Sequence, residues 1–354
     1  MQGGKKVMIC WQKFFMKNKK QRTILILKKR TWIIIWGILL LLAVLWSLSS
    51  GSGSASLKEL FLLIVQGEKT KSMRIMLYIR LPRVLGGIFA GAGLAVSGVI
   101  IQSVLNNSLA GPNIIGVNAG AGFAVALTAV LIPGKFSILP IAAFLGALVT
   151  VLLVFYVGKK TGASKVTLVL AGIAVNSILN AATDTVLTFV PDAILNNYSF
   201  RIGGLGGINS KVLYPACICI GLGTILAFCL NNEMDVLSLG EDTAKNLGLN
   251  ISWYRLLLLI IAAILAGASV SFAGLIGFVG LIIPHMSRIL VGAEGKYLIP
   301  TAALMGAACL TFCDFIARRL FAPYDISVGI ILSFLGAPFF LYLLVRKKGK
   351  GIYD

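Results

Sequence analysis

The chain has 354 residues, of which 58% are hydrophobic and only 12% are charged. Soluble domains carry about a quarter of their residues as charges, so this composition excludes an ordinary soluble domain and predicts an integral membrane protein. The formal net charge is +20, but the basic residues gather at the chain ends and in short links between apolar runs. They form no basic face interleaved with aromatic residues, so the charge indicates membrane topology and not nucleic-acid binding.

About 20 apolar residues cross the hydrocarbon core as a helix, and on this measure the sequence predicts an all-α, polytopic protein of about ten transmembrane helices. The predicted spans are 31–49, 84–105, 112–132, 136–158, 164–190, 211–230, 252–273, 276–292, 297–319 and 326–345. The first run is longer than the apolar core of a cleaved signal peptide, about 7–15 residues, so we interpret it as an uncleaved span. Ten spans put both termini on one side.

The distribution of basic residues predicts which side of the membrane holds both termini. The N-terminal arm, residues 1–30, has no acidic residue, and the link between the fourth and fifth spans carries Lys159, Lys160 and Lys165. Residues 347–354 form a short basic tail. If ten spans alternate, all three segments lie on the same side, and the excess of Lys and Arg predicts that this side is the cytoplasm.

The stretch before the second span then lies outside the cytoplasm, although it is basic. It contains Lys69, Lys71, Arg74, Arg80 and Arg83. Two interpretations remain open from the residues alone: long basic side chains that reach lipid phosphates at a helix end, or a docking surface for an acidic partner.

The fifth span carries Asn176, Asn180 and Asp184 at intervals of four residues, which places two amides and a carboxylate on one helix face. Polar groups at membrane depth are costly unless they face the bundle interior or water, so we expect this stripe to point inward. It either forms hydrogen bonds between helices or lines a path through the bundle.

A polar loop between the sixth and seventh spans predicts a short helix over residues 239–247. Ser238 and Glu241 have the spacing of a capping box, and Gly248 is a suitable stop. Ala244 and Gly248, one turn apart, would let the backbone come close to another surface. The helix is either a connector or a docking element for a partner.

The spans are rich in glycine, which predicts closely packed helices, and Pro284 predicts a short, broken eighth span. Asp314 and Arg318 are four residues apart in the favourable order, so we expect them to pair.

His285 is the only histidine and has no second ligand at metal spacing, so no metal site is predicted. The six cysteines show no CxxC pattern and are interpreted as core residues. GKKTGASK lacks Walker A spacing, so we expect neither nucleotide hydrolysis nor a cofactor in this chain.

Four long stretches together resemble the FecCD family, the permease subunits of bacterial ABC importers for iron-siderophore, haem or cobalamin complexes. They are RLPRVLGGIFAGAGLAVSGVIIQSVLNNSLAGPNIIGVNAGAG (80–122), LGEDTAKNLGL (239–249), GLIGFVGLIIPHMSRILVG (274–292) and CDFIARRLFAPYDISVGIILSFLGAPFFLYLL (313–344). The resemblance implies the type II ABC importer permease fold over residues 31–346. It also implies a multi-pass protein of the bacterial cell membrane, with both termini cytoplasmic.

The same resemblance implies partners and roles for particular residues. The partners are a second permease subunit, identical or homologous, two cytoplasmic ATPases that bind the ATP, and an extracytoplasmic binding protein. By this resemblance, the residues that dock the binding protein are Arg80, Arg83 and Arg318. The residues that couple to the ATPase are Leu239, Gly240, Glu241, Ala244, Leu247 and Gly248. The translocation path is lined by Asn176, Asn180, Asp184 and Arg201 on the fifth span and after it, and by the tenth span.

The chain departs from the family pattern at three places. It has Asn107-Ser-Leu-Ala110 where a proline usually follows the asparagine, Ser327 where a proline is usual, and Arg201 at a usual tryptophan position. An arginine near the outer mouth predicts selection for an anionic cargo, such as a ferric siderophore or haem with its propionates.

The expected function is therefore inward transport of an iron complex, with a ferric siderophore favoured and haem or cobalamin as the alternative. Two other classes remain as competing hypotheses. An intramembrane enzyme would need paired acids, a Ser/His arrangement or a metal cluster at depth, which the sequence lacks, so we expect no enzymatic activity. A passive channel would leave the helix at 239–247 without a purpose.

Overall fold

The computed structural model describes residues 27–49, 74–161, 165–190, 198–320 and 324–348. Within these ranges every regular element is a helix. The chain runs through a helix at Leu27–Ser49, η1 (Met76–Arg80), α4 (Leu81–Val104), α5 (Val117–Leu131), η2 (Phe136–Ile138), α6 (Leu139–Lys160), α7 (Lys165–Phe189), α9 (Ser210–Cys229), α10 (Asn231–Ser238), α11 (Glu241–Asn246), α12 (Ile251–Ala273), α13 (Val279–Val291), α14 (Gly295–Leu320) and α15 (Val328–Lys348).

The helices confirm an all-α, polytopic membrane protein. In the described ranges, seven helices are long and apolar enough to cross a membrane, and three shorter apolar helices lie at Val117–Leu131, Val279–Val291 and Val328–Tyr342. Each of the ten predicted spans therefore coincides with one helix. The third starts five residues later than predicted, at Val117, because residues 112–116 form a turn that ends at Gly116 with φ of 90°.

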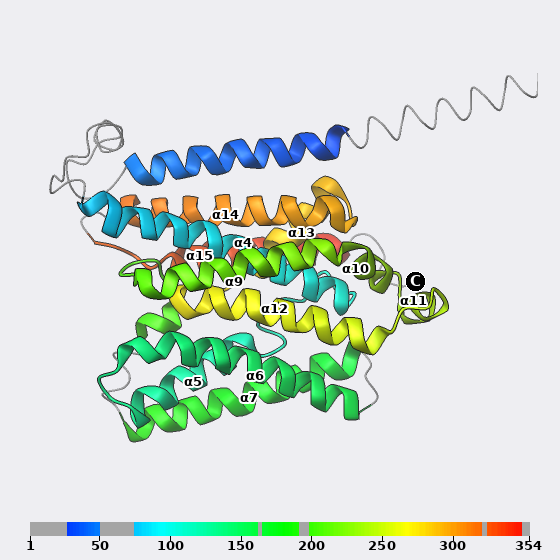
Figure 1. Cartoon of the computed structure of the whole chain (residues 1–354), viewed down its shortest axis with the longest axis horizontal. Coiled ribbons are helices and arrows are strands. Elements are labelled where there is room, and N and C mark those ends of the chain that lie inside the picture. The colour runs from blue at the N-terminus through cyan, green and yellow to red at the C-terminus, as the bar shows by residue number, and fades with distance from the viewer. Residues whose placement is uncertain (1–26, 50–73, 162–164, 191–197, 321–323, 349–354) are drawn as a thin grey trace, which may run out of the picture.

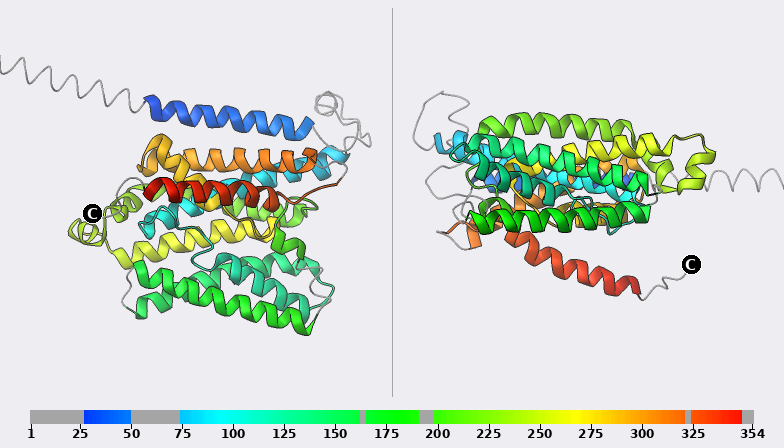
Figure 2. Two further views of the ribbon diagram at one scale, coloured as in Figure 1. Left: turned by 180° about the vertical axis from the view of Figure 1, so that it is seen from behind. Right: turned by 90° about the horizontal axis from the view of Figure 1, so that it is seen from below.

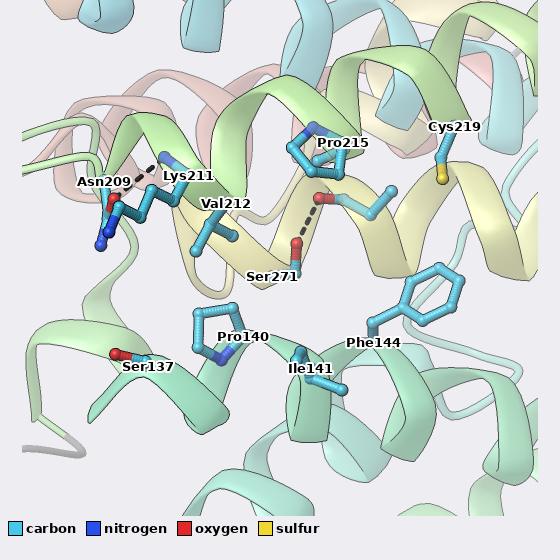
Figure 3. A pocket seen from close by; sticks show the side chains of 12 residues that line it. Ser137, Pro140, Ile141, Phe144, Asn209, Lys211, Val212, Pro215, Cys219 and Ser271 are labelled. Atoms are coloured by element: carbon cyan, nitrogen blue, oxygen red, sulfur yellow. Dashed lines mark hydrogen bonds between the residues drawn. The ribbon is translucent and has the colours of Figure 1, made fainter. Parts of the chain in front are cut away.

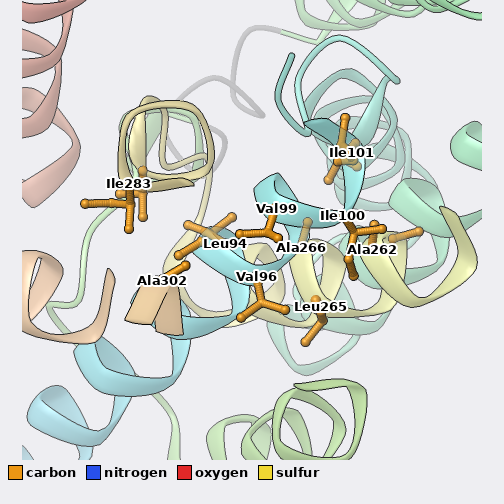
Figure 4. Close-up of a cluster of buried hydrophobic side chains, with 14 of the residues drawn as sticks. Leu94, Val96, Val99, Ile100, Ile101, Ala262, Leu265, Ala266, Ile283 and Ala302 are labelled. Carbon is orange, nitrogen blue, oxygen red and sulfur yellow. The ribbon is translucent and has the colours of Figure 1, made fainter. Parts of the chain in front are cut away.

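The helices run side by side along one axis, with α4 in the centre of the bundle (Figure 1). Most of α4 is buried, and it packs against α9, α12, α13 and α14. Its apolar side chains meet those of the surrounding helices, as Figure 4 shows for Leu94 and Ile100 of α4, Leu265 of α12, Ile283 of α13 and Ala302 of α14. This helix is the core of the protein.

Glycines set the distances between α4 and its neighbours. A Cβ on Gly91 would overlap the carbonyl oxygen of Gly306 in α14, and a Cβ on Gly98 would overlap that of Gly280 in α13. Small residues let membrane helices approach until their backbones touch. The predicted dense packing is therefore confirmed at these crossings.

The Leu27–Ser49 helix lies at the edge of the bundle beside α14 (Figure 1) and buries little of its surface. Lys29 Nζ is 2.9 Å from Glu294 Oε1 and lies 5.3 Å from the centre of the Tyr297 ring. Further along, the ring of Trp46 lies 6.2 Å from that of Phe312. A few polar and aromatic contacts therefore attach this helix to α14.

The eighth predicted span is short, as expected, but its break lies elsewhere. α13 is continuous through Pro284 and has only 13 residues. The chain before it, Gly274 to Gly277, is not helical, and Phe278 takes the unusual φ of 65° at the start of α13. The interruption is therefore on the N-terminal side of α13.

The two ends of the bundle differ. α10, α11, the start of the Leu27–Ser49 helix and the end of α15 lie at one end, here called the α11 end (Figures 1 and 2). η1 and the first turns of α9 and α15 lie at the opposite end, the η1 end. The first and last described helices therefore have their outer termini on the same side, as an even number of spans requires.

A methyl group at the α4–α13 crossing should destabilise the bundle. We expect Gly98→Ala to lower the free energy of unfolding by about 1–3 kcal/mol, because the added atom forces the two backbones apart. Gly221→Ala is the matched control, since a Cβ on Gly221 of α9 meets no atom within 4 Å. Denaturant titration of the purified chain in detergent measures both. Equal stability of the two variants would contradict the proposed close contact.

Candidate functional site

Two arginines share one buried aspartate at the η1 end. Nε of Arg83 on α4 donates to both carboxylate oxygens of Asp314 on α14, at 3.0 and 3.1 Å. Nε of Arg318 is 3.2 Å from Asp314 Oδ2, which confirms the predicted pair within α14. The Asp314 side chain is only 2% exposed. Its charge is balanced by two guanidinium groups that join α4 to α14.

The same network reaches two further segments. Nη1 of Arg83 is 2.8 Å from Oδ2 of Asp325, an exposed residue just before α15. Nη2 of Arg318 donates to the hydroxyl of Ser47 at 2.5 Å, and Nη1 of Arg80 donates to the carbonyl oxygen of Leu48 at 2.8 Å. Carbonyl groups in the last turn of a helix have no partner within it. The arginines therefore hold the C-terminal end of the Leu27–Ser49 helix.

The structure brings Arg80, Arg83 and Arg318 together, but each is bonded within the chain. Arg80 is only 3% exposed and does not present its guanidinium group on the surface. Arg83 and Arg318 are mostly covered, and the most accessible member of the network is Asp325, at 61% exposure. Docking through these arginines remains a prediction. Among the described residues, their shown role is to tie helices together.

All four residues predicted for the path line one cavity of about 300 Å³. Asn176, Asn180 and Asp184 come from α7, and Arg201 comes from the short helical segment 198–202. The remaining lining is Asn113, Asn118, Ala119, Gly122, Thr183 and Leu275. The polar stripe of α7 therefore does share one face, and that face borders a polar space.

The two interpretations of this stripe apply to different residues. Nδ2 of Asn176 donates to the carbonyl oxygen of Asn113 at 2.8 Å and so fixes the turn before α5. Arg201 Nη1 lies 3.6 Å from Asp184 Oδ1, and these side chains are 53% and 67% exposed. An exposed ion pair contributes little energy. Arg201 is therefore still available to an anion that enters the cavity.

Asn113 and Asn118 were missed in the sequence. Asn113 lies in the turn that precedes α5 and Asn118 in the first turn of α5, and each amide sits in a run of small and apolar residues. An amide side chain in an apolar run, with no role assigned to it, is the sequence signal that would have indicated these two residues. Only the packing of α5 against α7 places them opposite the polar stripe.

The short helix at the α11 end is α11, Glu241–Asn246, which is shorter than the predicted 239–247. The predicted capping box is wrong, because the Ser238 hydroxyl donates to the carbonyl oxygen of Asp235 in α10. Gly240, with φ of 111°, precedes the helix and no side chain caps it. The predicted stop at Gly248 is confirmed by its φ of 80°. The amides of Gly248 and Leu249 bond the carbonyl oxygens of Lys245 and Ala244, the pattern of a Schellman motif.

The surface that this helix offers differs from the expected one. Ala244 is fully buried and faces the protein, so it does not form the expected close-approach surface with Gly248. Leu239 and Leu247, on either side of α11, are exposed instead. Any apolar contact that this helix makes with another surface would therefore involve the two leucines and not Ala244.

Ion pairs and caps fix the position of this loop. Nη2 of Arg255, buried on α12, donates to Oε1 of Glu241 at 2.7 Å. In α10, both carboxylate oxygens of Asp235 accept from the amide of Gly295, at 2.9 and 3.0 Å, at the start of α14. Burial raises the pKa of Asp235, and the bond from Gly295 opposes that shift. α10 and α11 are therefore attached to α14 and α12, whose movements they would share.

Within the described ranges, no group of three or more His, Cys, Asp or Glu residues is arranged to hold a metal ion.

Comparisons with known proteins agree with this architecture. Residues 39–346 match the model of the FecCD transport family. The chain is 37% identical over 311 residues to the Fe(3+)-citrate import system permease protein YfmD of Bacillus subtilis, covering 86% of this chain and 91% of that protein. It is 36% identical to the hemin transport system permease protein HmuU of Yersinia pestis, covering 89% and 96%. The ferric enterobactin transport system permease protein FepD of Escherichia coli is also 36% identical, with 90% and 96% covered.

A solved structure shares the fold. An inward-facing metal-chelate type ABC transporter superposes with a TM-score of 0.78 and 29% identity, covering 90% of this chain and 99% of that one. The fold is that of an ABC transporter permease with multiple membrane helices. The chain belongs to the FecCD transport family.

Removal of the shared carboxylate should destabilise the η1 end. We expect Asp314→Ala to lower the free energy of unfolding by about 3–5 kcal/mol, because two largely covered guanidinium groups lose their common counter-charge. Asp325→Ala removes an exposed partner of Arg83 and should cost less than about 1 kcal/mol. Denaturant titration of the full chain in detergent measures both, and a loss for Asp314→Ala no larger than that for Asp325→Ala would refute the shared-charge interpretation.

The Glu241–Arg255 pair should control the order of α11. We expect Glu241→Ala to speed amide hydrogen exchange across residues 241–249 severalfold, because it removes the ion pair that attaches α11 to α12. Asp242→Ala is the matched control: it removes the same charge from the next residue, which forms no ion pair among the described residues. Unchanged protection in Glu241→Ala, measured by mass spectrometry, would show that the pair does not position the helix.

Proposed function

We propose that the chain is the permease subunit of an ABC importer that moves an iron complex into the cell by alternating access. The cargo we favour is a ferric siderophore, and haem or cobalamin is the alternative. The observation that carries the proposal is the family match over residues 39–346, together with relatives named as permeases for iron citrate, hemin and ferric enterobactin.

The polar cavity supports an anionic iron complex as cargo. Arg201 supplies a positive charge, and Asn180 supplies an amide that accepts and donates hydrogen bonds. Asp184 would hold Arg201 in place until an anionic group of the cargo competes for it. A cavity of about 300 Å³ would accommodate part of a large chelate, so the other half of the path would come from a second permease subunit.

The α11 end supports an ATPase partner. In this proposal, Leu239 and Leu247 contact the ATPase, while Glu241, Ala244 and the glycines Gly240 and Gly248 give the loop its shape. Two ATPase subunits would bind the ATP, and the chain itself would need no cofactor and catalyse no reaction. Since α11 is attached to α12, closure of the ATPases would tilt α12 and the helices packed on it.

The η1 end supports an extracytoplasmic binding protein. An acidic side chain of that partner would compete with the exposed Asp325 for Arg83. Arg318 and Arg80 lie in the same cluster. Docking would then replace the Asp325 carboxylate on Arg83 by a carboxylate of the partner. This change would affect the ends of the helices that the arginines join.

We infer the orientation from the basic residues. The α11 end would face the inside of the bacterial cytoplasmic membrane, because Lys159 and Lys160 at the end of α6 and Lys165 at the start of α7 lie there. The arm at 1–30 and the tail at 347–354 would then be cytoplasmic, on either side of the permease domain at 31–346.

Stimulated ATP hydrolysis in the reconstituted complex tests the proposal. We expect the binding protein loaded with an anionic ferric siderophore to stimulate hydrolysis and uptake into proteoliposomes. Arg201→Trp should reduce this uptake by about tenfold to a hundredfold, because it removes a charge-assisted contact worth roughly 1.5–3 kcal/mol. Arg201→Lys should retain most of it. Lys135→Gln, which removes an exposed charge outside the cavity, serves as control.

The outcomes separate the alternatives. Stimulation by haem or cobalamin and not by a ferric siderophore would establish the alternative cargo. No stimulation by any of the three would reject an iron-complex importer. Unchanged uptake of an anionic cargo by Arg201→Trp would reject the role of Arg201 and leave the transport class standing.

A further inference from the structure

A second cavity lies away from the polar one, between α6, α9 and α12 (Figure 3). Its volume is about 350 Å³. α6 and α9 both pack against α12 but make few contacts with each other, so they leave a groove above α12. The lining residues are Ser137, Pro140, Ile141, Phe144, Asn209, Lys211, Val212, Pro215, Ala216, Cys219, Ala268 and Ser271.

The groove follows the helix axes. On α9 its wall is built by Val212, Pro215, Ala216 and Cys219, the spacing of one helix face. From Val212 to Cys219, eight residues, the helix rises about 10 Å. The floor is formed by Ala268 and Ser271 of α12, whose small side chains leave space between α6 and α9.

The groove is polar at one end only. Asn209, Lys211 and Ser137 gather at the η1 end, and Phe144 and Cys219 lie at the other end, deeper along the helices (Figure 3). The Ser271 hydroxyl in the floor donates to the carbonyl oxygen of Ala268 at 2.8 Å, so it is satisfied within its own helix. Among the described residues, none forms an ion pair with the Lys211 ammonium group.

The groove opens on the lateral surface of the bundle, which would face lipid in a bilayer. α9 lies on one face of the bundle and α15 on the opposite face (Figure 2). Around the groove, α6 and α9 expose Ile141, Leu145, Tyr214 and Ile218, which are side chains suited to lipid. In a bilayer, an apolar groove that opens sideways is filled by hydrocarbon, because water would find no polar partners there.

We propose that this groove binds one anionic phospholipid, with an acyl chain along α9 and the phosphate on Lys211. The polarity of the groove matches that of the lipid, since the basic end lies at the helix starts and the apolar end points into the bilayer. A groove of about 10 Å spans much of one leaflet, whose hydrocarbon is about 15 Å thick. The proposal requires only that the chain is a multi-pass membrane protein and does not depend on its cargo.

Photo-crosslinking tests the site. The full chain is placed in bilayers with phosphatidylglycerol that carries a photoactivatable group on its acyl chain, and crosslinked peptides are mapped by mass spectrometry. We expect labelling on the α6 and α9 residues that line the groove, such as Phe144 and Cys219. Unlabelled phosphatidylglycerol should compete, and phosphatidylcholine should compete weakly.

Two charge variants provide the matched comparison. We expect Lys211→Gln to reduce labelling of the groove about fivefold, the ratio that corresponds to about 1 kcal/mol per basic residue near anionic lipid. Lys135→Gln removes an exposed charge next to η2 that does not line the groove and should change labelling little. Labelling in both variants is read as the ratio of groove to α7 peptides, which cancels differences in yield.

Three outcomes would overturn the proposal. The first is labelling spread evenly over all exposed apolar helices, which would show annular lipid alone. The second is an equal loss in Lys211→Gln and Lys135→Gln, which would show a general charge effect. The third is crosslinking of the groove residues to a second protein chain in the assembled complex, which would show that a protein helix occupies the groove.

Discussion

The bundle depends on close contact between helix backbones around α4. In lipid, helices gain no hydrophobic energy by meeting each other, because the acyl chains are as apolar as the side chains. Dispersion between surfaces that fit is then the main attraction, and it requires small residues at the crossings. Gly91 against Gly306 and Gly98 against Gly280 supply that fit. The positions of α13 and α14, and of everything attached to them, follow from these two crossings.

Polar contacts hold the parts that this packing does not reach. The Leu27–Ser49 helix buries little surface, and its ends are tied by Lys29 to Glu294 and by Ser47 to Arg318. Asp314 is the centre of the second set, since it balances the charges of Arg83 and Arg318. Ion pairs at the ends of membrane helices avoid the cost of charge at the bilayer centre. Helices that must shift relative to one another can therefore be linked at their ends without a rigid apolar interface.

Three regions of different chemistry lie apart on this chain: the α11 end, the η1 end and the polar cavity. The α11 end presents two exposed leucines on a loop attached to α12 and α14, and the η1 end presents a carboxylate over a group of arginines. The polar cavity lies between these ends, against α5 and α7. In the proposed importer, the two ends would meet partner proteins on opposite sides of the membrane, and the polar cavity would form part of the path between them.

The sequence by itself determined the elements and their class. Apolar length fixes where helices form, because every backbone group in lipid must be satisfied within its own segment, so all ten spans were predictable. The i, i+4 spacings predicted the Asp314–Arg318 pair and the polar face of α7, and the long motifs predicted the family. Local spacing was less reliable at α11, where the expected cap by Ser238 does not form.

The tertiary structure decided which distant residues meet. Asp314 accepts from Arg83, 231 positions away, and Arg80 bonds the end of the first helix, so arginines expected on the outer rim are used inside the protein. Ala244 faces inward because the loop folds back on α12, and this leaves Leu239 and Leu247 as the exposed contacts. Asn113 and Asn118 join the cavity only because α5 packs against α7. Local sequence sets each helix and its faces, whereas the partner of each face depends on how helices far apart in the chain fit together.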